Sequence, residues 1–333
     1  MIKRLAIENF KSIRSLELEC RRVNVFIGEP NTGKSNILEA LGLLSFIPYG
    51  AGSKAIELQD YLRTNEPYRL FHNYNVKEEI RVTIDGEELV GSFDKLRGAI
   101  LLSFSGAKIS RITPKKTQVL HEGPLPRTIT STRFYRFKRK VTFWRSRLSF
   151  LSPPDGRNLP NVLALNPSLR DLVRDILEDY DQELVINEFE PSLSVMWRLN
   201  GVPRLLPYEL VSDTLRRLIF HLAAVESNEG AVITMEEPEA HAFPTYTKYL
   251  AERVALDERN QYFITTHNPY FLLSLVEKTP VKELAVYVTY LRGYETRAKL
   301  LSEDELEELL DLASAVFFNL DRFLKGLLGV PED

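Results

Sequence analysis

Cysteine and long apolar runs are the features that this 333-residue chain most clearly lacks. Cys20 is its only cysteine, which excludes an internal disulfide and a cysteine-based zinc cluster. No stretch approaches eighteen consecutive apolar residues, so we expect no bilayer-spanning helix and no membrane partner. The apolar core of a secretion signal is missing from the first residues, MIKRLAIENFKS, and we therefore expect a cytoplasmic location.

The composition excludes further classes of protein. Hydrophobic residues make up 44% and charged residues 27% of the chain, values typical of globular proteins, so disordered and fibrous classes are excluded. The 43 basic and 46 acidic side chains give a net charge of −3. A near-neutral total identifies no partner, because it can conceal local clusters of charge. No internal repeat and no heptad run long enough for a coiled coil is present.

Three short apolar runs predict buried strands, each followed by a polar turn and a helical pattern. They are Val23–Ile27, Ala231–Met235 and Tyr262–Thr265. Strands that alternate with helices indicate a parallel sheet with both faces covered. Between about residues 80 and 120 the runs become short and alternating, and Asp85-Gly86 is typical of an antiparallel hairpin. Residues 152–183 return to a helical pattern, so we expect one α/β body with an inserted subdomain.

The segment GEPNTGKS, Gly28 to Ser35, matches the phosphate-loop pattern G-x-x-x-x-G-K-[ST] at every fixed position. Gly28 and Gly33 let the backbone curl so that successive amides face phosphate oxygens, and the following helix N-terminus adds partial positive charge. Lys34 is expected to neutralise the β- and γ-phosphates, and the Ser35 hydroxyl to bind Mg²⁺. A glycine turn with a chance lysine is the alternative.

Two glutamates, Glu236 and Glu237, follow the apolar run AVITM. They lie at the carboxyl end of a predicted parallel strand, where α/β sheets bind ligands. Two adjacent carboxylates there are unfavourable unless they face a cation. One can hold Mg²⁺ while its neighbour polarises the attacking water. The alternative is the solvated start of a loop.

His267 follows the third predicted strand and precedes the turn dipeptide Asn268-Pro269. A lone histidine is more often a core or surface residue than a functional one. At this strand end, however, its ring can reach the γ-phosphate or the attacking water, so we predict a role in the same site.

These motifs, in this order, resemble those of the ABC-type AAA ATPases of the SMC, RecF and OLD (overcoming lysogenization defect) kind. The group's first strand and turn are matched by IKRLAIENFKSI, its Walker A motif by GEPNTGKSNILEAL, its Walker B motif and D-loop by MEEPEAHAFP, and its histidine switch by TTHNP. The resemblance covers about residues 1–50 and 200–290. Between them, SPPDGRNLPNVLAL looks like the start of the helical lobe in small OLD-like archaeal and bacterial members.

The resemblance implies an α/β P-loop NTPase fold of the ABC-ATPase head type, with a mixed sheet, an antiparallel β subdomain and a helical lobe. It implies ATP and Mg²⁺ as ligands, and a homodimer that holds two ATP molecules between Walker A of one copy and the signature motif of the other. Ser35 and Glu236 then hold the metal. The implied catalytic residues are Glu237 as the base, His267 and Lys34. Nucleotide contacts are implied for Gly28, Glu29, Pro30, Asn31, Thr32, Gly33, Lys34, Ser35, Asn36, Lys11 and Ser212.

The sequence departs from the family pattern at two places. Glu236 stands where many relatives have aspartate, and its longer side chain can still reach Mg²⁺ directly or through water. The signature appears as ELVSDTLRRL, in which Ser212 is present, no glycine follows, and Asp213 would repel a phosphate unless turned away. Both residues are good helix caps, so trans-activation and its loss both stay open. Gln118 is a Q-loop candidate by position only, and a surface role is the alternative.

We divide the chain into residues 1–130, an ATPase lobe with Walker A and the antiparallel subdomain; residues 131–212, a basic segment and the helical lobe; and residues 213–333, with Walker B, the D-loop and the histidine switch. We expect neither the long coiled coil of chromosome-organising relatives nor the nuclease domain of full-length OLD proteins. Beyond Ser302, the stretch SEDELEELLDLASAVFF predicts an acidic helix that packs on the body.

A basic segment lies between residues 113 and 148, where ten basic side chains accompany one acidic side chain, Glu122, with aromatic rings interleaved. Cations for phosphates and rings for bases are typical of nucleic-acid grooves. The alternatives are a strand pair with its rings inward and its arginines solvated, or a face that docks an acidic partner such as helix 303–311 of a second copy. The basic residues are Lys115, Lys116, Arg127, Arg133, Arg136, Lys138, Arg139, Lys140, Arg145 and Arg147.

The leading hypothesis is an ATP-hydrolysing, dimerising switch that acts on nucleic acid or on a partner protein. The alternative is a nucleotide-binding scaffold with little turnover that regulates a partner. A transporter subunit is disfavoured because the usual signature is absent. A P-loop kinase is disfavoured because paired glutamates with a distant histidine fit hydrolysis better than transfer to an acceptor.

Overall fold

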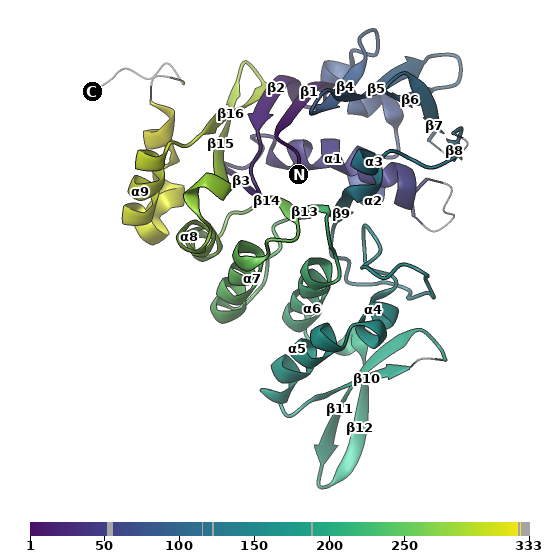
Figure 1. Ribbon diagram of the computed structural model, residues 1–333, viewed down its shortest axis with the longest axis vertical. Coiled ribbons are helices and arrows are strands. Elements are labelled where there is room, and N and C mark those ends of the chain that lie inside the picture. The colour runs from purple at the N-terminus through teal and green to yellow at the C-terminus, as the bar shows by residue number, and fades with distance from the viewer. Residues whose placement is uncertain (52–55, 115, 122, 188, 326, 328–333) are drawn as a thin grey trace.

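A computed structural model describes residues 1–51, 56–114, 116–121, 123–187, 189–325 and 327. At its centre lies a six-stranded sheet in the order β16-β15-β3-β14-β13-β9 (Figure 1). All neighbouring pairs are parallel except β15 with β16, which are antiparallel. The strands are β3 (Val23–Gly28), β9 (Thr132–Tyr135), β13 (Val232–Glu236), β14 (Gln261–Thr265), β15 (Leu284–Arg292) and β16 (Glu295–Leu300).

The register of the parallel strands aligns their carboxyl ends. Glu236 of β13 stands opposite Thr265 of β14, which in turn stands opposite Phe26 of β3. On the other side of β13, Met235 stands opposite Tyr135 of β9. Because parallel strands end at the same edge, the residues that follow these strands meet there.

Helix α1 (Lys34–Tyr49) and a seven-stranded antiparallel sheet share a core with one face of the central sheet, through residues such as Phe26, Phe134 and Phe263. The order of the antiparallel sheet, β2-β1-β4-β5-β6-β7-β8, confirms the predicted antiparallel subdomain and the hairpin at Asp85-Gly86. Its strands are β1 (Arg4–Phe10), β2 (Ile13–Glu19), β4 (Ile80–Ile84), β5 (Glu87–Asp94), β6 (Ala99–Phe104), β7 (Ala107–Ile112) and β8 (Thr117–Val119).

Helices cover the opposite face and enclose the larger core. Two of them begin at clear side-chain caps: the Asn268 side chain accepts from Tyr270 N and Phe271 N, and Ser302 forms a capping box with Glu305. The acidic helix predicted beyond Ser302 is confirmed as α9. The helices on this side are α4 (Leu159–Leu165), α5 (Pro167–Glu178), α6 (Asp213–Glu226), α7 (Pro244–Leu256), α8 (Pro269–Lys278) and α9 (Glu303–Leu312).

A small three-stranded sheet, β10-β11-β12, projects beyond α4 and α5 at the end of the molecule opposite the antiparallel sheet (Figure 1). Its strands are β10 (Glu183–Asn187), β11 (Ser192–Leu199) and β12 (Val202–Pro207). With α4 and α5 it forms the predicted helical lobe, which thus carries a sheet that the sequence pattern did not indicate. Short helices α2 (Gln59–Leu62) and α3 (Arg127–Ser131) lie beside α1.

Other sequence expectations can be compared with this fold. The three predicted parallel strands are confirmed as β3, β13 and β14. The three-part division at residues 130 and 212 stays a proposal; β9, in its middle part, pairs with β13. Within the described part of the chain, no helix combines the length and the apolarity needed to cross a bilayer. Lys115 and Glu122 of the basic segment lie outside the described residues.

Arg22, which directly precedes β3, stabilises the end of helix α7. Its buried guanidinium donates hydrogen bonds to the carbonyls of Ala255 and Asp257, both at 2.7 Å, and pairs with Glu283 at 2.6 Å. These carbonyls have no partner within the helix, and a cation near a helix C-terminus is favourable.

We predict that Arg22→Met lowers the free energy of unfolding by about 3 kcal/mol, because it leaves buried carbonyls unsatisfied. Urea denaturation followed by circular dichroism measures the change. Arg14→Met serves as the control, since Arg14 is exposed and makes one ion pair at 3.3 Å; we expect a loss under about 0.5 kcal/mol. Equal losses of unfolding free energy in the two variants would contradict the proposed stabilisation of α7 by Arg22.

Candidate nucleotide site

The predicted site residues meet at the carboxyl edge of the central sheet. Gly28 ends β3, Glu236 ends β13, and His267 follows β14 by two residues. Ser35, in the first turn of α1, donates a hydrogen bond to Glu236. The Nε2 atom of His267 lies 3.7 Å from Glu237 Oε1. Walker A, Walker B and the histidine, which are far apart in the sequence, therefore form one cluster.

The phosphate loop has the backbone that its glycines permit. Asn31 has a φ of 64° and Gly33 a φ of 93°, which is left-handed backbone that most residues avoid. A Cβ at Gly33 would also overlap the Thr296 hydroxyl. The Thr32 hydroxyl lies 2.8 Å from Glu29 O and 2.7 Å from Thr289 Oγ1. The side chain of Thr289, on β15, thus fixes the position of the phosphate loop.

Lys34 folds back over its own loop. Its Nζ donates to Gly28 O at 2.9 Å and to Glu29 O at 2.7 Å. Burial lowers the pKa of Lys34 to about 8, although the charges of Glu237 and Glu29 oppose the shift. The ammonium is thus held among neutral carbonyls, and a phosphate would satisfy it better because a charged acceptor makes a stronger bond.

Ser35 and Glu236 fit a magnesium ion. Their hydroxyl and carboxylate oxygens are in hydrogen-bond contact, and Mg²⁺ in phosphate sites takes one or two protein oxygens together with phosphates and water. Among the described residues, no group of three or more His, Cys, Asp or Glu side chains could hold a metal by itself. Two protein oxygens are within the number that a cation bound together with nucleotide phosphates takes from a protein.

Glu237 has a φ of 43°, a strained conformation for a residue with a side chain. The strain is held by its N–H, which donates to Thr265 O at 3.0 Å. Glu237 raises the pKa of Lys34 and opposes the lowering of the His267 pKa, so its charge faces both residues. Burial, with Lys34 as a second cause, lowers the pKa of His267, which favours the neutral imidazole near pH 7.

Two arginines at this edge were not predicted as part of the nucleotide site. Arg63 follows α2 and contacts Glu236, and its Nη2 donates to Ser35 Oγ at 3.1 Å. Arg136 directly follows β9, and its Nη2 lies 3.3 Å from both Glu236 Oε2 and Glu39 Oε1. The sequence feature that could have identified Arg136 as a site residue is its position directly after the short run TRFY, which forms β9. No local pattern marks Arg63.

Lys11 lies deeper in the same cluster. Its ammonium pairs with the fully buried Glu39 and donates to Leu62 O at 2.5 Å. Burial lowers the pKa of Lys11, and Glu39 opposes that shift. The implied nucleotide contact of Lys11 remains a proposal, as do those of the P-loop residues and of Asn36. Asn36 donates to Ser12 Oγ at 2.6 Å.

Ser212, the remaining implied nucleotide contact, is the N-cap of α6. Its hydroxyl accepts from Leu215 N at 3.2 Å. Asp213 pairs with Arg139, Arg216 and Arg217 at 3.2–3.4 Å, and hydrogen bonds and charges from these arginines lower the pKa of Asp213 against the opposing effect of burial. Gln118 is exposed on the edge strand β8 of the antiparallel sheet. This position agrees with a surface role, which was the alternative to a Q-loop role.

Much of the basic segment is engaged within the protein. Besides Arg136, Arg133 bonds to Asn228, and Lys138 pairs with Asp60 at 2.7 Å and with Asp155 at 3.4 Å. The rings of Phe134 and Tyr135 are fully buried and cannot stack on bases. The half-buried cations Arg133, Arg136 and Lys138 are thus engaged by the protein itself. Nucleic-acid contact stays a hypothesis, and of its seven candidate cations the exposed ones are Arg139, Lys140, Arg145 and Arg147.

Two protein-family models match successive parts of the chain. The first is described as an AAA ATPase domain and matches residues 1–142. The second is described as an AAA domain, putative AbiEii toxin, type IV TA system, and matches residues 142–274. Together the two matches cover residues 1–274, and they confirm the predicted resemblance to the ABC-type AAA ATPases of the SMC, RecF and OLD kind. The match to an AAA ATPase domain indicates nucleotide binding, and the P-loop geometry is the part of the molecule that fits it.

Curated relatives of this ATPase are distant. The DNA replication and repair protein RecF of Thermoanaerobacter sp. (strain X514) is 27% identical over 135 residues, which is 37% of this chain and 35% of that protein. The chain thus matches about a third of the RecF length. An ATP/GTP phosphatase of Helicobacter pylori is 18% identical over 363 residues, covering 92% of this chain and 93% of that protein.

Solved structures support the fold. An Smc head bound to the C-winged helix domain of ScpA has a TM-score of 0.54 at 14% identity, covering 92% of this chain and 99% of that chain. An Smc head bound to the C-terminal domain of ScpA derived from Pyrococcus furiosus has a TM-score of 0.52 at 11% identity, covering 93% and 98%. The predicted ABC-ATPase head fold is thereby confirmed.

Glu239, in the turn after Walker B, is a buried carboxyl beside the histidine segment. Its Oε1 accepts from Thr266 Oγ1 at 2.5 Å, and its Oε2 is buried without a partner among the described residues. Burial raises the pKa of Glu239 to about 7, and the Thr266 hydrogen bond only partly offsets this. The protonated form therefore stabilises the fold below the unfolded pKa of 4.5, and that stability is lost as pH rises through about 7.

We predict that Glu239→Gln, neutral at every pH, stabilises the protein by about 3 kcal/mol at pH 8 and changes it little near pH 4.5. Free energies of unfolding of the wild type and the variant, measured from pH 4.5 to pH 8, test whether the substitution becomes more stabilising as the pH rises. Glu258→Gln is the control, because Glu258 is exposed and its replacement should have a small effect. A Glu239→Gln effect that does not vary with pH would show that the carboxyl is not buried in its charged form.

Proposed function

We propose that this protein is a magnesium-dependent ATP hydrolase that works as a dimerising switch. The observation that carries the proposal is the contact of Ser35 with Glu236 beside the pair of Glu237 and His267, all at the mouth of the phosphate loop. Such a site neutralises phosphate charge and positions a water, which is most of what phosphoryl transfer requires.

Each residue has a distinct role in this proposal. Lys34 leaves its loop carbonyls for the β- and γ-phosphates, and Glu237 orients the attacking water as the base. His267, with its pKa lowered, accepts or donates one hydrogen bond at the γ-phosphate. Mg²⁺ held by Ser35 and Glu236 would supply charge neutralisation between the phosphates.

Dimerisation is proposed through the helix that Ser212 caps. Asp213 is neutralised by three arginines of its own chain, so its charge repels a partner's phosphate less than the sequence suggests. The Thr214 hydroxyl donates to His241 O at 2.8 Å, which ties this helix start to the D-loop. The two segments that would meet a second copy are thus held as one surface.

We predict that Glu237→Gln keeps ATP binding within about threefold, accumulates an ATP-bound dimer and lowers kcat by about 10²–10⁴-fold. Equilibrium nucleotide binding, light scattering and phosphate release measure the three quantities. Wild-type turnover should rise with the square of protein concentration where the dimer is the minor species. Lys34→Ala is the control that loses nucleotide binding. A monomeric and fully active Glu237→Gln protein would contradict the proposal.

The second candidate is a nucleotide-dependent scaffold with little turnover that regulates a partner. It is favoured by the absence of glycine after Ser212 and by the ion pairs of Arg63 and Arg136 with Glu236. One structural neighbour is an Smc head bound to ScpA, and a partner protein on this chain is proposed by that analogy. Negligible turnover with and without nucleic acid, at full nucleotide occupancy, would select this candidate.

Nucleic acid is the other proposed target, through the four exposed cations Arg139, Lys140, Arg145 and Arg147. Four phosphate contacts predict that log K falls against log salt with a slope of about −3 to −4 on duplex DNA. Fluorescence anisotropy from about 50 to 200 mM salt measures it, and the fourfold alanine variant should flatten the slope. Absence of DNA binding by the wild type at low salt would contradict the proposed nucleic-acid target.

A further inference from the structure

Arg136 occupies a position that the proposed reaction leaves unexplained. β9 pairs with β13 in parallel, so the residue after Tyr135 stands beside Glu236. The Arg136 Nη2 atom is 3.3 Å from Glu236 Oε2 and 3.3 Å from Glu39 Oε1, and Nη1 donates to Asp60 O at 3.2 Å. The guanidinium therefore contacts one of the two oxygens with which Glu236 would bind a metal.

The surroundings of Arg136 leave it incompletely satisfied. Its guanidinium carbon lies 4.9 Å from the centre of the Phe134 ring, and burial lowers its pKa although Glu39 opposes this. Its Nε is buried without a hydrogen-bond partner among the described residues. A buried charged donor left unpaired is costly, so the site favours an additional acceptor.

The charge balance of the cluster points to an anion. Three cations, Lys11, Arg63 and Arg136, contact two carboxylates, Glu39 and Glu236. The charge of Asp60 also acts on Arg136, but that carboxylate is already paired with Lys138 at 2.7 Å. The direct ion pairs therefore set three cations against two carboxylates. A phosphate placed at the mouth of the loop would supply the missing negative charge and the missing acceptor.

We propose that Arg136 gates the metal site: it holds the Oε2 atom of Glu236 until nucleotide phosphates draw its guanidinium away, and only then is that oxygen free for a divalent cation. Two cations on the same carboxylate oppose each other, so binding of the metal becomes dependent on binding of the nucleotide. Arg136 is thus a positioning residue, and the inference rests on the proposed metal–nucleotide site.

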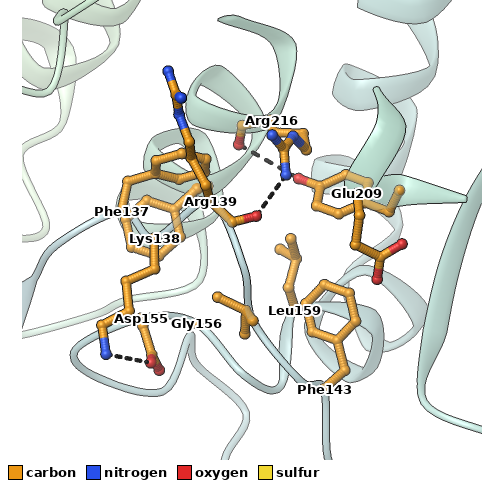
Figure 2. Close-up of a pocket in the computed structure, with 12 residues that line it drawn as sticks. Phe137, Lys138, Arg139, Phe143, Asp155, Gly156, Leu159, Glu209 and Arg216 are labelled. Atoms are coloured by element: carbon orange, nitrogen blue, oxygen red, sulfur yellow. Dashed lines mark hydrogen bonds and ion pairs between the residues drawn. The ribbon is translucent and has the colours of Figure 1, made fainter. Parts of the chain in front are cut away.

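The segment that carries Arg136 is anchored so that only its side chain needs to move. Arg136 N donates to Pro154 O at 2.8 Å. Lys138 points to Asp155, and the Arg216 guanidinium donates to Arg139 O at 2.7 Å (Figure 2). Since the main chain is fixed on both sides, exchange of Glu236 for a phosphate is a rotamer change and requires no refolding of the loop.

The test is the affinity for Mn²⁺ without nucleotide, measured by electron paramagnetic resonance. Arg136→Gln should bind Mn²⁺ about tenfold more tightly than the wild type, because a competing charge is removed. The same variant should bind metal-free ATP about tenfold more weakly, because a phosphate contact is lost. Arg136→Lys, which keeps the charge, should restore both values. Opposite changes in the two affinities are not expected from a purely structural residue.

Controls separate this inference from the proposed function. Lys108→Ala removes an exposed cation on β7 and should change neither affinity. If Arg136→Gln does not fold, Arg136→Met, which is neutral and needs no partner, replaces it. Wild-type protein that fails to bind Mn²⁺–ATP would overturn the proposed function. If the wild type binds Mn²⁺–ATP but Arg136→Gln or Arg136→Met has an unchanged affinity for Mn²⁺ without nucleotide, only the gating role is overturned.

Discussion

The parallel register of four strands is the constraint on which the site depends. β9, β13, β14 and β3 pair so that their carboxyl ends are level, and each end delivers one part of the chemistry: Arg136, the two glutamates, His267 and the phosphate loop. A strand shifted by one residue would turn these side chains to the other face of the sheet. The two apolar cores that cover the sheet therefore position the site as well as stabilise the fold.

The edge of the sheet brings cations and carboxylates into direct contact. Lys34 is satisfied by loop carbonyls, and Glu236 by Ser35, Arg63 and Arg136. These partners are the ones that a phosphate and a divalent cation would replace. The protein thus keeps Lys34 and Glu236 in contact with polar partners without ligand, and binding would exchange these contacts for contacts with the ligand. Such exchange costs little reorganisation, because the groups are already held at the place where the phosphate charge arrives.

The sequence predicts the parts of this site whose chemistry fixes both residue type and spacing. The P-loop needs glycine at left-handed backbone and lysine at a helix start, and the Glu236–Glu237 pair follows a strand that its apolar run identifies. Arg63 and Arg136 escaped prediction as site residues because arginine is common on surfaces, and only the strand order shows what lies beside them. In the basic segment, alternating rings and cations equally fit a buried strand, and residues 132–135 form such a strand, in which the rings of Phe134 and Tyr135 are buried.

The signature helix shows how tertiary context changes the meaning of a motif. Read in sequence, Asp213 after Ser212 opposes an anion; in the fold, Arg139, Arg216 and Arg217 surround that carboxylate. The Ser212 hydroxyl caps Leu215 N, while the helix N-terminus retains its partial positive charge. Glycine in such a motif gives close backbone approach, and nothing replaces that here. In the proposed dimer, the missing glycine would limit how near a partner's phosphate can come, whereas the arginines around Asp213 would weaken the repulsion by its charge.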